Sequence, residues 1–202
     1  MSPLRRLSLR VEQVRELSAL ADVGEIARRY FAMNAFDGVL TIIGVLVGSY
    51  TAGIADARIV LTTGFATSLA MGVSGLWGAA LTESAERKRS LNELEQATLC
   101  DLGDTRLARA GRVAVVIVTL ADALAPVAAS ALVLMPLLLA PALGGIRASY
   151  FAALGVGLGT LFGLGMFLGR ISRSNLALSG LKTVSAGLVS ILVGLALHPA
   201  AG

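Results

Sequence analysis

Five long apolar stretches dominate the hydropathy pattern of this 202-residue chain, near residues 33–54, 59–82, 113–140, 148–169 and 177–197. Each is close to the roughly 20 residues that a helix needs to cross the hydrocarbon core of a bilayer. Membrane barrels would instead show alternating segments of about 10 residues separated by many turns. The pattern therefore predicts an all-α fold, a polytopic membrane protein with five transmembrane helices.

Composition indicates a membrane environment, and the distribution of charge predicts the topology. The chain is 55% hydrophobic and 15% charged, with a mean hydropathy of +0.78, which excludes an ordinary soluble domain. Of its 17 Lys and Arg residues, all but Arg58 and Arg147 precede the first span, separate the second from the third, or surround the turn between the fourth and fifth. The positive-inside rule then predicts a cytoplasmic N-terminus and a C-terminus outside. The basic charge indicates contact with the lipid bilayer and no nucleic acid, because no stacking aromatics accompany it.

Two polar segments lie outside the spans. Residues 1–32 mix both charge signs and repeat apolar residues at helical spacing, which predicts a cytoplasmic amphipathic helix and no cleavable signal. The segment 83–112 is a short cytoplasmic linker, into which the second helix continues as "LTESAERKRSLNELEQA". The single Cys100 excludes an intramolecular disulfide and every multi-cysteine metal motif.

Glycine is concentrated in the spans. Gly155, Gly159 and Gly163 follow at intervals of four, so they share one helix face and predict a close-packing surface. Because five spans make a thin bundle, we expect a homodimer. In the second span Gly72, Gly75 and Gly78 form a row that allows another backbone, or a permeating ion, to come close.

Two aspartates interrupt apolar runs. Asp37 lies just inside the first span, and Asp122 lies about 15 Å into the third at about 1.5 Å per residue. A carboxylate near the bilayer centre costs about 2.5–3.5 kcal/mol, so both are candidate functional groups. Pro126, one turn after Asp122, frees a carbonyl beside that carboxylate. The alternatives are protonated, hydrogen-bonded aspartates between helices, or an Asp37 shallow enough to meet headgroups.

Neighbouring residues extend this candidate metal site. Met33 and Asn34 precede Asp37 by about one turn and provide an outer rung on the same face. Met71 lies near the centre of the second span, although a methionine in an apolar helix is usually packing. Carboxylate oxygens together with a thioether fit Fe²⁺ or Mn²⁺ better than Mg²⁺ or Ca²⁺.

A row of glutamates follows the second span: Glu83, Glu86 and Glu93. At a cytoplasmic mouth such a row would concentrate divalent cations. An equally simple interpretation is a solvated helix with Glu and Arg pairs.

The segments "NAFDGVLTIIGVLVGSY", "SLAMGVSGLWGAALTESAERKRSLNELEQ" and "LADALAPVAASALVLMPLLLAP" resemble the vacuolar iron transporter family, in particular its short prokaryotic members. The resemblance covers residues from about 28 to 197. It implies a five-helix homodimer that moves Fe²⁺, and often Mn²⁺, out of the cytoplasm, in eukaryotic members by proton exchange. It also implies intramembrane metal ligands at Asp37 and Met71, and the short members' D-x-x-x-P pattern supports Asp122.

The chain departs from that family's pattern in two places. Many members carry a glutamate soon after the A-M motif, where this chain has Gly75. Eukaryotic members also insert a three-helix, carboxylate-rich domain between the second and third spans, where this chain has only 83–112. Metal storage on a dedicated domain is therefore not expected here.

These observations lead to one hypothesis and two alternatives. Fe²⁺ or Mn²⁺ is the transported substrate, gathered at the glutamate row and held at a two-fold interface by Asp37, Met71 and Asp122, with protons exchanged on release. The protein would be a transporter with no permanently bound cofactor, in a prokaryotic plasma membrane. The alternatives are an intramembrane aspartyl enzyme, whose Y-D and G-x-G-D signatures are missing from the sequence, and a structural or regulatory protein whose glycine face binds partner helices.

Overall fold

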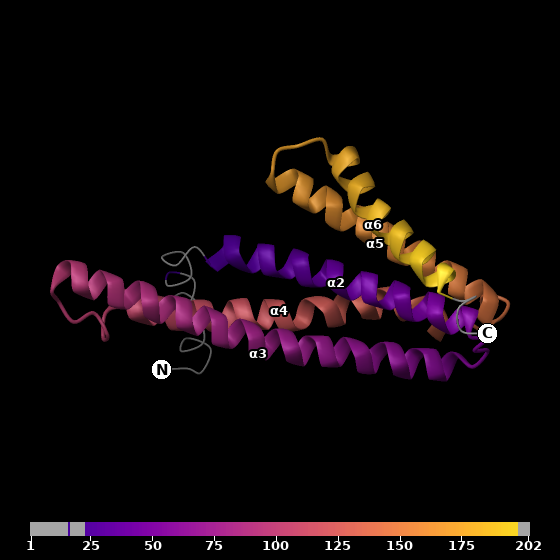
Figure 1. The fold of residues 1–202 in the computed structure, drawn as a ribbon, viewed down its shortest axis with the longest axis horizontal. Helices are drawn as coiled ribbons and strands as arrows, with labels where there is room; N and C mark the ends of the chain where they lie inside the picture. Colours follow the sequence, from indigo (N-terminus) through magenta and orange to yellow (C-terminus); the bar gives the residue numbers. More distant parts are fainter. Residues whose placement is uncertain (1–15, 17–22, 198–202) are drawn as a thin grey trace, which may run out of the picture. The chain divides into compact units, whose positions relative to one another are not determined.

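The structure, a computed structural model, describes Glu16 and residues 23–197. These residues form helices and connecting turns without a strand (Figure 1). The helices are α2 (Val23–Thr51), α3 (Ala57–Thr98), α4 (Arg106–Leu138), α5 (Ile146–Ile171) and α6 (Leu176–Ala196). All 5 are long and apolar enough to cross a membrane. The predicted all-helical fold with five candidate spans is confirmed, and it supports an integral membrane protein.

Helices α2 and α3 extend beyond the predicted spans. The described part of α2 begins at Val23, so the end of the predicted N-terminal helix is continuous with the first span. Val23 is buried against Ala114 and Val118 of α4. The rest of that predicted helix lies outside the described residues, apart from Glu16. Helix α3 continues to Thr98 as predicted. The segment 83–112 is therefore largely helical, and residues 99–105 connect α3 to α4.

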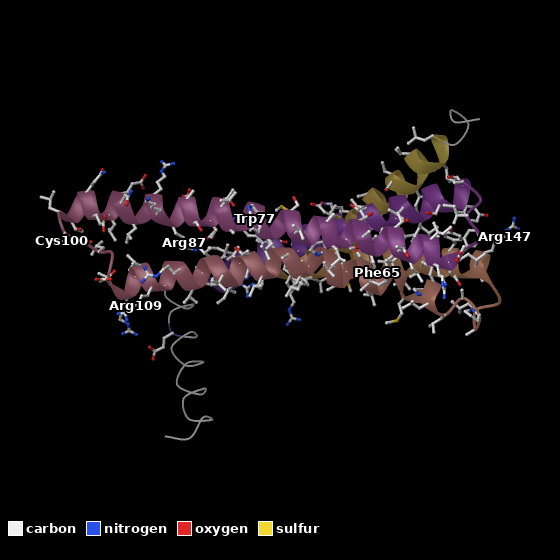
Figure 2. All side chains as sticks on the ribbon, turned by 90° about the horizontal axis from the view of Figure 1, so that it is seen from below. Phe65, Trp77, Arg87, Cys100, Arg109 and Arg147 are labelled. Atoms are coloured by element: carbon white, nitrogen blue, oxygen red, sulfur yellow. The ribbon has the colours of Figure 1, made fainter. Side chains whose placement is uncertain are left out.

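The chain divides into two compact units. The first consists of Met1–Phe31 and Val73–Ala123. In it, the end of α3 and the start of α4 form an antiparallel hairpin with Cys100 at the tip (Figure 2). The Glu95 carboxylate accepts a hydrogen bond from the Leu102 backbone N–H at 2.9 Å and fastens the connection. Leu99 ends α3 in the left-handed conformation, with φ 53°.

The second unit consists of Ala32–Gly72 and Leu124–Gly202. Its core buries residues of α2, α4 and α5, among them Ile42, Ile43, Leu134 and Leu161. The glycine at 38 lets α2 approach α4 closely, because a Cβ there would lie 2.7 Å from the Cα of Pro126.

Helices α5 and α6 pair within this unit through small residues. The Thr183 hydroxyl donates to the Leu161 carbonyl at 2.7 Å, across the two helices. Gly165 and Gly169 face α6 so closely that a Cβ on either would collide with it. The predicted packing face is different: a Cβ at Gly155, Gly159 or Gly163 would meet nothing within 4 Å. That face is open in the single chain, and the intramolecular contact uses the neighbouring one.

Candidate functional site

The Asp122 carboxylate lies against α3 at the position of Gly75. Asp122 is 5% exposed. A Cβ on Gly75 would lie 2.9 Å from Asp122 Oδ2 and 3.4 Å from the Asp122 carbonyl oxygen. The missing side chain thus makes the space that the carboxylate occupies. Pro126 has no N–H and therefore cannot donate the usual helical hydrogen bond to the Asp122 carbonyl. Two oxygens of Asp122 face Gly75.

The other aspartate, Asp37, is on the opposite side of its helix from the core. The buried face of α2 includes Ala35, Val39, Ile42 and Leu46. At about 100° per residue, Asp37 lies about half a turn away from this face, and it is exposed. In the single chain, the neighbours of Asp37 in sequence pack on the core and Asp37 itself does not.

The other predicted ligands of the spans are placed as follows. Met33 is 56% exposed and shares the open face of α2 with Asp37, one turn away as predicted. Asn34 and Met71 are half-buried. The structure therefore brings Met33 and Asp37 onto one face and leaves Asn34 at its edge.

Two of the three glutamates in the row on α3 form Glu–Arg pairs, as in the interpretation of a solvated helix. Glu83 accepts a hydrogen bond from Arg87 at 2.8 Å, and Glu93 accepts one from Arg89 at 2.9 Å. The hydrogen bond from Arg89 to Glu93 raises the pKa of this arginine above its ordinary value, and the charges of Glu93 and Glu86 add to the effect. Glu86 is exposed. Arginines thus neutralise much of the charge that a cation-gathering mouth would need.

Within Glu16 and residues 23–197, no three His, Cys, Asp or Glu side chains come together as a metal site. The carboxylates of one chain are distributed along the helices instead. Among the described residues of the chain, the acidic positions in the spans are separate from one another, and Asp122 is the most enclosed of them.

Two features were not anticipated from the sequence. The hydroxyl of Thr119, one turn before Asp122 on α4, is buried with no hydrogen-bond partner. A cavity of about 430 Å³ also lies between α3 and α4 near the hairpin, lined by Arg87, Lys88 and Arg112 together with leucines. In the sequence, the i, i+3 spacing of Thr119 and Asp122 is the one pattern that draws attention to the Thr119 hydroxyl. The cavity depends on the pairing of the two helices, which no local pattern specifies.

Comparison with known proteins identifies a relative that matches most of the chain. No protein-family model matches the chain. A protein of Methanocaldococcus jannaschii, the uncharacterized protein MJ0645, is 32% identical over 173 residues, which cover 84% of this chain and 87% of the archaeal protein. The chain belongs to the family of MJ0645. Since the shared region includes most of both chains, the family is defined over the spans and not over one segment. The name of this relative states no activity, so function is argued from the residues.

Proposed function

We propose that the protein is a transporter that exports Fe²⁺ or Mn²⁺ from the cytoplasm, in the manner of the vacuolar iron transporters that its sequence resembles. The observation that carries the proposal is the Asp122 carboxylate, 5% exposed in an apolar helix and seated in the notch at Gly75. We place the protein in a prokaryotic plasma membrane.

Asp122 lies in an apolar segment that contains no basic residue. No lysine or arginine occurs between Arg112 and Arg147, or between Arg58 and Arg87, so the apolar parts of α3 and α4 contain no basic residue. Burial disfavours a charged carboxylate, which is relieved by a proton or by a bound cation. A group that exchanges these two partners is what a proton-coupled cation transporter requires. This chemistry supports antiport.

The open face of α2 supports a homodimer. It carries Asp37, and a Cβ at Gly44 or Gly48 on the same face would meet nothing within 4 Å. Small residues let two helices approach in a bilayer. A two-fold contact along this face would cover Asp37 and bring two copies of it together, which supplies the second carboxylate that one chain lacks.

Isolated ligands suit a transported substrate better than a resident metal. An ion that crosses a membrane must be bound strongly enough to enter and weakly enough to leave.

The second candidate function is a non-transporting structural or regulatory membrane protein. The open face of Gly155, Gly159 and Gly163 on α5 favours it, since an unpaired small-residue face fits a partner helix. This candidate predicts that both aspartates are dispensable.

The deciding experiment measures Mn²⁺ and Fe²⁺ flux into proteoliposomes, with and without a pH gradient. Wild type is compared with Asp37→Asn, Asp122→Asn and the control Asp56→Asn, whose carboxylate only accepts the Arg58 N–H at 2.8 Å in an exposed turn. We expect each of the first two variants to lose most of the flux and the control to keep it. Full flux in both intramembrane variants, or no flux in a folded wild type, refutes the proposal.

A further inference from the structure

The hydroxyl of Thr119 is buried and differs in its bonding from the hydroxyls of several other threonines in these helices. The hydroxyls of Thr62, Thr67 and Thr160 each donate to the carbonyl four residues earlier, at 2.7–2.8 Å. Thr119 is 8% exposed and its hydroxyl has no partner. A buried polar group without a hydrogen bond is costly, and in a native protein it points to a water or an ion.

Thr119 precedes Asp122 by three residues on α4, and both residues are buried. Two contacts fix the antiparallel register: a Cβ at Gly75 would touch the Asp122 carboxylate, and a Cβ at Gly111 would touch the Arg87 side chain. In this register, Thr119 lies at the level of Ala79, which is 3% exposed. Residues three apart on a helix have Cβ atoms about 5–6 Å apart. One ion, or one water bound to it, can therefore bridge the Thr119 hydroxyl and the Asp122 carboxylate.

We propose that Thr119 supplies an oxygen ligand to the cation that Asp122 holds, so that the α3–α4 contact contains an oxygen-only site. This inference rests on the proposed transport function and deepens it. The donors are the Thr119 hydroxyl, the Asp122 carboxylate and the Asp122 carbonyl. The two oxygen groups of Asp122 face Gly75. Hydroxyl, carboxylate and carbonyl oxygens suit a hard divalent cation such as Mn²⁺.

The test measures Mn²⁺ binding to the full-length protein in nanodiscs by calorimetry and by Mn²⁺ electron paramagnetic resonance. The variants are Thr119→Val, which removes the hydroxyl at nearly constant volume, and Thr119→Ser, which retains it. Thr160→Val is the matched control, because its hydroxyl already bonds to the Val156 carbonyl. Thermal unfolding of each metal-free protein is measured alongside.

We expect Thr119→Val to weaken Mn²⁺ binding about tenfold, with Thr119→Ser within about threefold of wild type and Thr160→Val unchanged. Metal-free Thr119→Val should melt no lower than wild type, because it loses an unpaired hydroxyl and not a hydrogen bond. If Thr119→Val lowers the Tm, Thr119→Ser decides: preserved affinity supports the ligand role, and lost affinity overturns it.

The outcomes separate this inference from the proposed function. If wild type binds Mn²⁺, Asp122→Asn abolishes binding and Thr119→Val does not change it, the role of Thr119 is refuted and transport through Asp122 stands. If wild type binds neither Mn²⁺ nor Fe²⁺, both proposals are refuted.

Discussion

Replacing Gly75 by alanine tests the arrangement on which the candidate site depends. The added methyl group would lie 2.9 Å from Asp122 Oδ2 and 3.4 Å from the Asp122 carbonyl oxygen. Ordinary van der Waals contact begins at 3.4 Å, so the carboxylate oxygen and the added methyl group must move apart by roughly 0.5 Å. A movement of that size reaches the tolerance of a preorganised site, which is about 0.5 Å.

The same substitution at Gly78 is the matched control, since a Cβ there would meet nothing within 4 Å. Each alanine gains about 0.5–1 kcal/mol of helix stability relative to glycine. Only Gly75→Ala adds an overpacking cost, about 1–3 kcal/mol. At about 2–4 °C per kcal/mol, Gly75→Ala should melt about 2–12 °C below Gly78→Ala.

Two assays measure the consequences: thermal unfolding of the purified variants, and Mn²⁺ flux in proteoliposomes at equal protein density. We expect Gly75→Ala to reduce flux about tenfold, and Gly78→Ala to retain wild-type flux, because only the first displaces the carboxylate. Equal melting temperatures and equal flux for the two variants would refute the placement of Asp122 against Gly75.

Three further predictions concern glycines on different helix faces. Gly75→Glu should abolish flux, because it places a second carboxylate opposite Asp122. The double variant Gly75→Glu/Asp122→Ala should transport more Mn²⁺ than Asp122→Ala alone, since the new carboxylate replaces the lost one. Equal flux in the double variant and in Asp122→Ala contradicts the prediction. Gly165→Ala should lower stability by about 1–3 kcal/mol through collision with α6, while Gly163→Ala, on the open face, should be neutral or stabilising by up to about 1 kcal/mol; thermal unfolding distinguishes them. Gly44→Cys in a cysteine-free background should form a disulfide-linked dimer in membranes under mild oxidation, and a purely monomeric product would argue against the α2 contact.

The sequence predicts the helices well and their contacting faces less well. Apolar length defines the five spans, because hydrogen bonding within the backbone leaves few alternatives in lipid. Which glycines pack is a different matter. Gly155 and Gly165 both belong to regular small-residue spacings, but only Gly165 meets α6. Spacing defines a face, and the tertiary pairing selects the face that is used.

The candidate site likewise has features that the sequence predicts and features that depend on tertiary packing. Asp122 is recognised from its depth in an apolar run, and its burial agrees with this prediction. The position of Asp37 just inside an apolar run is also visible in the sequence. Its exposure in the single chain follows from the packing of Ala35, Val39 and Ile42 on the core, which composition does not reveal. The role of Gly75 required the register of α3 against α4. A sequence identifies the unusual groups in a membrane; the neighbours of each group come from tertiary structure.

The tip of the α3–α4 hairpin makes the orientation of the protein measurable without engineering. Cys100 is the one cysteine of the chain, and it is exposed beside the end of α3. A membrane-impermeant maleimide added to intact cells can react with this thiol only from outside, and the same reagent added to inverted vesicles reports the cytoplasmic side. Native protein thus contains its own topological label, and a fluorophore attached there gives a site-specific reporter remote from the candidate residues of the spans.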